Sequence, residues 1–277
     1  MADLYPFKGY ENSVLENKIK SILDTKLDMN RFMTPDYDLV EDAGMIKKVH
    51  KYTGSGTVDD LARGEGNTHF VDAEFSEESY EVSRTQGQAK YFDDDIMTDP
   101  VLIDAKVKYL AEGMVNDWTH KAIAEFAKST NTAAITDWSF ADFADAIAVY
   151  ANEHEEEDGL FFLVGMTAVP SIRKALNENL KYVEGYVRTG YVGSVCGVPI
   201  YMSKALDNME EDSEGKPLGF LATREAVTAF IKKDVRVEQG RNIDTKENMI
   251  VADRYAVIAL TDETKCVKLI EASSETI

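Results

Sequence analysis

The chain has 277 residues, 44% of them apolar, which is enough to bury a substantial core and excludes disorder of the whole chain. Fifty acidic against thirty basic side chains give a net charge of -20, and this balance argues against a protein that holds DNA through clustered lysine and arginine. The two cysteines, Cys196 and Cys266, lack CxxC spacing, so neither a disulfide framework nor a zinc site is expected. No apolar run has the length of a signal peptide or membrane span, and we expect the chain to be made in the cytoplasm.

The first 46 residues predict an arm. Their one helical candidate, residues 14–27, has only a loose apolar face, and Pro35 with the acidic residues after it ends that pattern. Such a segment has too few apolar residues to fold alone. We therefore expect it to pack on the rest of its own chain or on a neighbour.

Residues 47–91 predict a long two-stranded excursion, because glycines recur there and apolar side chains alternate along the chain. Residues 71–75 and 80–84 are the alternating runs, and residues 76–79 are expected to turn between them. A ribbon of two strands without a third is marginal in water. Its apolar side should therefore be covered by another surface.

Residues 98–130 predict one long helix, which at about 1.5 Å per residue would measure roughly 45 Å. Asp99 suits the cap of the first turn, and Pro100 suits the position after it. Apolar residues then recur at steps of three and four and stack along one face. They are Ile103, Val107, Leu110, Met114 and Trp118, with Ile123 and Phe126 further along.

The second half of the chain predicts an α/β layer followed by long strands. Ser139 and Asp142 have capping-box spacing ahead of a helix, and residues 160–164 form a continuous apolar run typical of a strand covered on both faces. A short helix should begin near Pro170, and the Tyr- and Gly-rich residues 177–194 predict a surface loop. Further strands are expected at residues 196–206, 219–223, 226–239, 249–260 and 266–270, with a loop at 242–248.

The sequence contains no catalytic, cofactor or metal site that we can identify. Gly54 and Gly56, like the glycines at 64 and 66, lack the third glycine of a dinucleotide fingerprint, so a flexible loop is the better account. The residues around Cys196 do not form a nucleophile elbow. His154 lies among glutamates and would hold a cation weakly, but a solvated acidic face explains the run better, and residues 93–95 suit a helix N-terminus.

The order of these elements resembles that of the major capsid proteins of tailed phages. Residues 160–177, LFFLVGMTAVPSIRKALN, look like the family's buried strand and short helix, and residues 190–206, GYVGSVCGVPIYMSKAL, look like its Gly-rich lead into a strand. Residues 235–269 are similar to its paired C-terminal strands, which end in a short strand after a turn.

The resemblance implies an α+β, Hong Kong 97-like major capsid fold. Its parts would be an N-terminal arm (1–46), an extended β-hairpin loop laid over the neighbouring subunit (47–91), a peripheral domain with a long spine helix (92–134), an axial α/β domain (135–222), and the return strands of the peripheral domain with the C-terminal strand (223–277). Contacts between subunits are then expected on the loop and around residues 242–248. The residues expected there are Gly54, Gly56, Arg63, Phe70, Phe75, Tyr80, Arg84, Arg241, Asn242, Lys246 and Asn248.

The resemblance also implies a structural protein without enzymatic activity or cofactor. Copies would form hexamers and pentamers of an icosahedral phage head, assembled in the host cytoplasm, that encloses double-stranded DNA without reading its sequence. The expected partners are other copies of the chain, a portal and a separate scaffold protein. Binding to a membrane is not expected. Asn248 matches the asparagine of self-crosslinking members, but Tyr255 stands where they carry a glutamate, which weighs against covalent crosslinking.

Two other functions stay open at this point. An encapsulin-type nanocompartment shell would share the fold and would require a cargo-peptide groove. A soluble α/β enzyme or binding protein would share only the fold class. Electron microscopy separates shells from small discrete particles, and protected DNA separates a phage head from a compartment that packages an enzyme.

Overall fold

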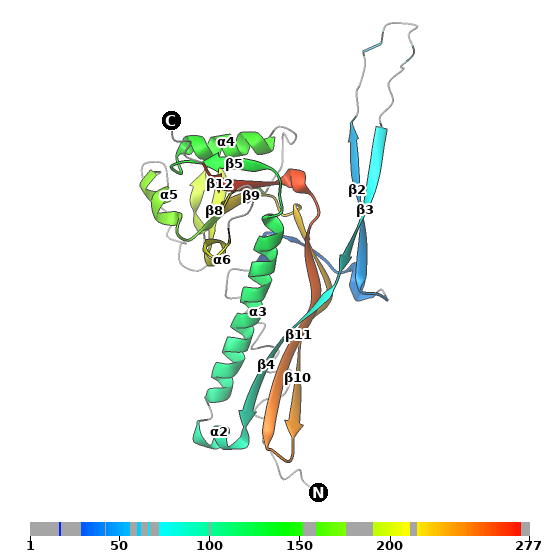
Figure 1. Cartoon of the computed structure of the whole chain (residues 1–277), viewed down its shortest axis with the longest axis vertical. Helices are drawn as coiled ribbons and strands as arrows, with labels where there is room; N and C mark the ends of the chain where they lie inside the picture. The colour runs from blue at the N-terminus through cyan, green and yellow to red at the C-terminus, as the bar shows by residue number, and fades with distance from the viewer. Residues whose placement is uncertain are drawn as a thin grey trace.

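The computed structural model of the protein describes residues 29–41, 43–55, 60–61, 66, 72–99, 101–151, 159–175, 191–210 and 215–272, together with Asn17. It is a mixed α+β structure with a long four-stranded sheet, a six-stranded sheet and a separate two-stranded ribbon. The six-stranded sheet and its helices form a compact head. The long sheet and helix α3 (Leu102–Phe126) extend away from this head, and the ribbon projects on one side (Figure 1).

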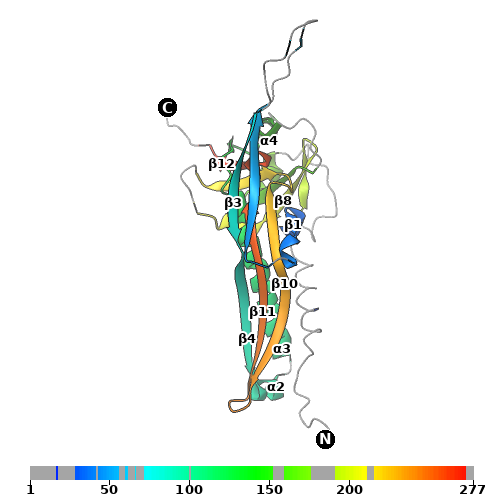
Figure 2. The ribbon, with the colours of Figure 1, turned by 90° about the vertical axis from the view of Figure 1, so that its right-hand side faces the viewer.

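The four-stranded sheet has the order β1-β10-β11-β4. Strands β10 and β11 are antiparallel and joined by a short turn, β4 adds antiparallel to β11, and the short β1 runs parallel to β10. Their bounds are β1 (Thr34–Asp36), β4 (Ser83–Phe92), β10 (Val227–Asn242) and β11 (Glu247–Leu260). Figure 2 shows β4, β11 and β10 running side by side along α3, so the helix and the sheet form two layers.

The six-stranded sheet has the order β5-β12-β9-β6-β8-β7. Its strands are β5 (Thr132–Ile135), β6 (Phe161–Gly165), β7 (Tyr191–Val195), β8 (Val198–Ser203), β9 (Pro217–Ala222) and β12 (Cys266–Glu271). The helices beside it are α4 (Phe140–Ala151), α5 (Val169–Ala175) and α6 (Lys204–Asp207). Because β12 lies between β5 and β9, residues 223–277 contribute strands to both sheets. The proposed domain boundaries within the chain stay a prediction.

The head is built around β6, all five residues of which are buried. Successive side chains of a strand point to opposite faces. Phe162 therefore meets Phe143 of α4 edge-on at 4.9 Å between ring centroids, while Phe161 faces Phe126 at the end of α3, at 6.3 Å. The predicted strand covered on both faces is confirmed.

The capping box ahead of α4 is also confirmed. The backbone N–H of Asp142 donates to Ser139 Oγ at 3.3 Å, and the N–H of Ser139 donates to Asp142 Oδ2 at 2.9 Å. These bonds satisfy donors that a helix start otherwise leaves without a partner. The predicted short helix near Pro170 is present as α5.

The single helix predicted over 98–130 is wrong at its start. The chain forms α2 (Asp93–Thr98), leaves the helical conformation at Asp99 with φ -146° and ψ 98°, and begins α3 at Leu102. A residue before proline is driven out of the helical region by the proline ring, and the Asp99 carboxylate accepts a hydrogen bond from the N–H of Val101 at 3.0 Å. The predicted apolar face is confirmed beyond that point. Its buried members are Ile103, Val107, Met114, Trp118, Ile123 and Phe126.

The turn predicted at residues 76–79 is also wrong. These residues lie inside β3 (Asp72–Glu81), which pairs antiparallel with β2 (Ile46–Ser55) from Ile46 opposite Glu81 to Ser55 opposite Asp72. The Ser-Glu-Glu-Ser run holds no glycine or proline to favour a turn, and an exposed strand tolerates its polar side chains. After buried Val82 the chain continues as β4 in the long sheet, so the second predicted run is divided between two strands.

Some predicted features lie outside the described residues. These are most of the helical candidate at 14–27, most of the loop at 177–194, and the contact candidates Gly56, Arg63 and Phe70. The short 3-10 helices within the described ranges are η1 (Met29–Arg31), η2 (Asp38–Val40) and η3 (Glu263–Lys265). No helix among the described residues is long and apolar enough to span a membrane.

Candidate assembly surfaces

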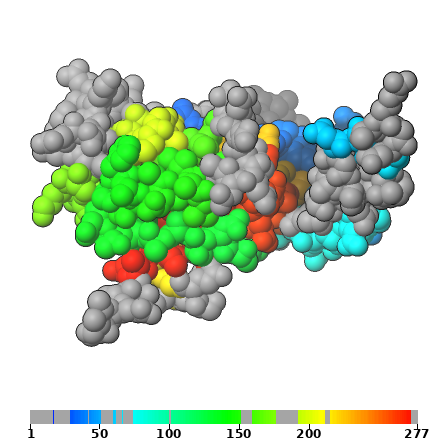
Figure 3. Space-filling model, turned by 90° about the horizontal axis from the view of Figure 1, so that it is seen from above, coloured from blue at the N-terminus to red at the C-terminus, as the bar shows by residue number. Residues whose placement is uncertain are grey.

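The ribbon formed by β2 and β3 presents apolar and charged side chains to solvent. Phe75 is 66% exposed and meets the His50 ring edge-on at 5.4 Å between centroids. Lys48 pairs with Glu77 across the ribbon, and this hydrogen-bonded ion pair lowers the pKa of the Glu77 carboxyl. An exposed pair of this kind contributes little to stability. Figure 3 shows β2 and β3, in blue and cyan, at the opposite side of the molecule from α4.

The root of the ribbon, by contrast, is fastened to the body. Lys47 Nζ lies 2.9 Å from Asp38 Oδ2 and 3.2 Å from Asp36 Oδ2, and the hydrogen bond to Asp38, followed by that to Asp36, raises the pKa of the Lys47 ammonium. The Tyr80 ring stacks on Phe230 of β10 at 5.8 Å between centroids, with 21° between the ring planes. Burial, then its hydrogen bond to Glu78, raises the pKa of the Tyr80 hydroxyl, which stays a donor.

The opposite end of the molecule is the turn between β10 and β11, and Asp93 at the start of α2 organises it. Its carboxylate accepts hydrogen bonds from Arg241 Nη2 at 2.8 Å and from Asn248 Nδ2 at 2.7 Å. The N–H of Asp93 donates to the carbonyl of Lys246 at 3.2 Å, while Asn242 Oδ1 accepts from the N–H of Asp244 at 3.0 Å. Two of the predicted contact residues, Arg241 and Asn248, are therefore engaged within their own chain.

Large apolar side chains are exposed around the same end. Ile243 in the turn is 72% exposed and Met97 in α2 is 70% exposed. Phe92, Val101 and Tyr109 are exposed on neighbouring elements. Single exposed apolar residues are ordinary, but several on one end of a chain indicate a contact surface.

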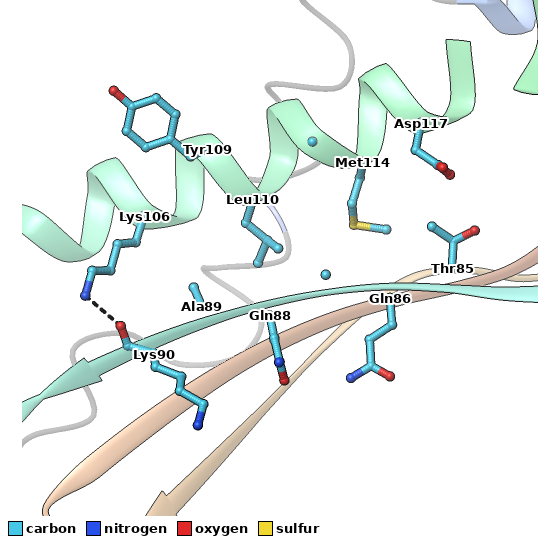
Figure 4. A pocket seen from close by; sticks show the side chains of 12 residues that line it. Thr85, Gln86, Gln88, Ala89, Lys90, Lys106, Tyr109, Leu110, Met114 and Asp117 are labelled. Carbon is cyan, nitrogen blue, oxygen red and sulfur yellow. Dashed lines mark hydrogen bonds between the residues drawn. The ribbon is translucent and has the colours of Figure 1, made fainter. Parts of the chain in front are cut away.

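A groove of about 620 Å³ lies between β4 and α3. Leu110 and Met114 of the helix form its apolar side, and Lys106 Nζ donates to the carbonyl of Lys90 at 2.6 Å across one end (Figure 4). At Gly87 a Cβ atom would come within 2.4 Å of Leu110 Cδ1, so the absent side chain lets strand and helix approach. Strand β4 is at the edge of its sheet, and an edge strand beside apolar side chains is suited to an extended segment rather than to chemistry.

The described residues do not assemble a catalytic group of side chains in this groove. Within the described ranges, no set of three or more His, Cys, Asp or Glu side chains is placed to hold a metal ion. Cys196 is exposed, and Cys266 is buried in β12, where burial raises its pKa to about 12 and keeps it a neutral thiol. The described surfaces consist of an unpaired edge of β4, exposed apolar side chains and charged side chains.

Most of the predicted contact residues that the structure describes lie either in the ribbon or at the β10–β11 turn, and Arg84 belongs to neither group. Gly54, Phe75 and Tyr80 belong to the ribbon, Arg84 lies in β4 opposite Tyr255, and the last four lie at the β10–β11 turn. Whether other copies touch them stays a prediction.

Sequence reasoning missed Asp36, Asp38, Phe230 and Asp93 as residues that shape these ends. Phe230 and Asp93 act on residues about 150 positions away, whereas Asp36 and Asp38 act on Lys47, about 10 positions away. No local sequence pattern predicts these contacts. The acidic run at 93–95 predicted a helix N-terminus, but not the hydrogen bonds that Asp93 accepts there.

Comparison with known proteins identifies the fold. No protein-family model and no curated protein matches the sequence. The structure is similar to that of Gordonia phage Cozz, with a TM-score of 0.66 and 8% identity over 90% of this chain and 87% of that chain. It is similar to the capsid of Ralstonia phage GP4, with a TM-score of 0.65 and 10% identity over 92% of both chains.

A virus-like particle from Pyrococcus furiosus is also similar, with a TM-score of 0.58 and 9% identity over 93% of this chain and 96% of that chain. In each of these three comparisons, the structural similarity extends over nearly the whole length of this chain and of the matched chain. The chain therefore has the Hong Kong 97-like major capsid fold that the order of its elements predicts.

Proposed function

We propose that this chain is the major capsid protein of a tailed phage, a structural subunit that assembles into the icosahedral head around double-stranded DNA. The observation that carries the proposal is that the chain has a capsid fold whose β2–β3 ribbon projects from the body and exposes Phe75 (Figure 1). A two-stranded ribbon is marginal in water by itself. Another copy of the chain supplies the surface that this copy lacks.

Association of copies through unlike surfaces is the mode that the fold favours. The ribbon at one side and the β10–β11 turn at the opposite end are different surfaces, so contacts between copies are heterologous, and such contacts close into rings when the rotation allows. Hexamers and pentamers in a closed shell belong to this proposal. The net charge of -20 suits a container that holds DNA without adhering to it. A portal and a separate scaffold protein belong to the same proposal.

The direct test is electron microscopy of the purified chain beside a variant with a shortened ribbon. Residues 52–75 are replaced by a short glycine-containing turn, which joins Lys51 to its register partner Ser76 and keeps the root and β4. We expect shells, capsomers or tubes from the full chain, and a folded but unassembled subunit from the variant. Circular dichroism and gel filtration check the fold. Normal shells from the shortened chain would contradict the role of the ribbon, and small discrete particles from the full chain would favour an enzyme or binding protein.

The second candidate is an encapsulin-type nanocompartment shell. The structure is similar to the virus-like particle from Pyrococcus furiosus over 96% of that chain. Its TM-score of 0.58 is below the values of 0.66 and 0.65 for the phage structures Cozz and GP4, so this candidate has less support. The contents of native particles distinguish the two functions. DNA that resists nuclease until the shell is opened supports the phage head, and a packaged enzyme without DNA supports the compartment.

A further inference from the structure

The ribbon leaves the body at a point where two cross-strand pairs meet. Lys47 and Tyr80 are directly opposite each other in β2 and β3, and Asp36 and Phe230 are directly opposite each other in β1 and β10. Residues opposite each other in neighbouring strands have side chains on the same face. Lys47 contacts Asp36 at 3.2 Å while Tyr80 stacks on Phe230 at 5.8 Å between centroids, so one pair rests on the other.

These four residues, here called the root junction, combine two kinds of contact. Lys47 Nζ also lies 5.8 Å from the centre of the Phe230 ring, so that ring has the ammonium near it and the Tyr80 ring stacked on it. Phe230 itself is only 3% exposed and packs in a cluster with Leu39, Val82 and Ala259. The ring is therefore a rigid reference surface that belongs to the body rather than to the ribbon.

Within the described part of the chain, the other face of the ribbon, which carries Lys48 and Phe75, makes no contact of this kind that could fix the angle between the ribbon and the body. Lys48, the next residue after Lys47, points to the other face, where it is largely exposed and pairs with Glu77 of the same ribbon. Further out, Phe75 is exposed and its ring contact is with His50, again within the ribbon. A contact inside the ribbon moves with it and cannot set its angle to the body. The angle is set by contacts that join the two parts.

We propose that the root junction fixes the angle at which the ribbon projects, and that this angle sets the curvature and so the uniform size of the assembled particle. The inference rests on the proposed function, because curvature has meaning only for a chain that assembles. Lys47, Asp36, Tyr80 and Phe230 are positioning residues in it. The ion pair resists rotation of the ribbon about its own axis, and the ring stack resists its tilting away from β10.

The test compares Lys47→Gln with Lys48→Gln. Each substitution removes one ammonium from the same strand. Lys47→Gln breaks two ion pairs with the body, to Asp36 and Asp38, whereas Lys48→Gln breaks one ion pair inside the ribbon. In the unassembled subunit, we expect hydrogen–deuterium exchange at the base of the ribbon, including the Val82 amide that donates to the Met45 carbonyl, to rise about tenfold in Lys47→Gln. Lys48→Gln should change it less than about twofold.

In micrographs, Lys47→Gln should give particles of mixed diameter or open sheets, while Lys48→Gln should give the single diameter of the unmodified chain. Asp36→Asn removes one of the two ion pairs of Lys47 from the side of the body and leaves the one to Asp38. It should reproduce the effect in part, so it carries the test if Lys47→Gln fails to fold. Uniform particles of unchanged diameter from both Lys47→Gln and Asp36→Asn would overturn the proposal. Equal effects of Lys47→Gln and Lys48→Gln would also overturn it.

Failure of the proposed function has a different signature. If the unmodified chain forms no shells, the capsid role is lost and the link to curvature with it. The exchange measurement, made on single subunits, still decides whether the junction holds the ribbon. Unchanged exchange in Lys47→Gln would refute the junction itself, with or without shells.

Discussion

Strands β6 and β3 have the same backbone conformation and opposite surroundings. All five residues of β6 are buried, with α4 on one face and the end of α3 on the other. The described side chains of β3, from Glu74 to Glu81, are exposed or half-buried. The apolar run of β6 is covered within its own chain, whereas β3 exposes Phe75 among serine and glutamate side chains. Strand β6 is therefore stabilised by packing inside the head, and the exposed side of β3 is the surface to which the proposed function assigns contacts between copies.

The largest effect expected from this comparison is on the buried strand. Phe162→Ala removes a ring that is fully buried against Phe143, and we expect it to lower the free energy of unfolding by about 3–5 kcal/mol. Urea denaturation of the unassembled subunit measures it. Phe140→Ala is the matched control, because Phe140 in the neighbouring helix is exposed and its truncation should cost less than about 0.5 kcal/mol. Similar losses in both variants would mean that the head is not packed as described.

An intermediate effect concerns the buried thiol of the head. Burial raises the pKa of Cys266 to about 12 from an ordinary value of 9.0, so the folded state favours the neutral thiol. Its contribution to stability is complete below pH 9 and is lost as the pH rises through the folded pKa, at about 1.4 kcal/mol per pH unit. Cys266→Ala should therefore show a shallower fall in unfolding free energy between pH 9 and 11 than the unmodified chain. Partial burial also raises the pKa of Cys196, but because this residue is exposed, Cys196→Ala should change the slope less than Cys266→Ala does. Identical slopes in all three chains would contradict the burial of Cys266.

The smallest effect on stability is expected in the ribbon. Phe75→Ala truncates an exposed ring and should change the unfolding free energy by less than about 0.5 kcal/mol. If other copies cover this ring in the shell, the same variant should need a higher protein concentration to assemble. Light scattering at increasing protein concentrations measures this threshold. Phe75→Leu keeps an apolar side chain and should recover most of the assembly. A stability loss as large as that of Phe162→Ala, or unchanged assembly, would remove the distinction between the two strands.

Much of the fold could be predicted because local patterns report local structure. The capping pair Ser139 and Asp142, the apolar run of β6 and the face of α3 all depend on residues close in sequence, and all are present. The errors arose where a local pattern was ambiguous. The Ser-Glu-Glu-Ser run at 76–79 fits a turn or an exposed strand equally well. The break at Asp99 depended on the effect of Pro100 on the residue before it, which overrode a good helical period.

The candidate surfaces were predicted less completely for a physical reason. Phe75 and Tyr80 were singled out by their alternation, but the ion pair and ring stack that hold the ribbon join residues about 10 and 150 positions apart. Arg241 and Asn248 were expected to face other copies. Their hydrogen bonds to Asp93 within the chain appear only when α2 is placed beside the β10–β11 turn.

The sequence by itself determined most of the helical and extended segments and the strand that is buried on both faces, because periodicity and polarity are properties of neighbouring residues. It did not determine the break at Asp99 or the strand conformation of residues 76–79. Only the tertiary structure decided that β2 rather than β4 pairs with β3, that β12 returns to the head, and that Lys47 and Tyr80 rest on Asp36 and Phe230. Those choices depend on which distant segments meet, and that is settled by the packing of the whole chain.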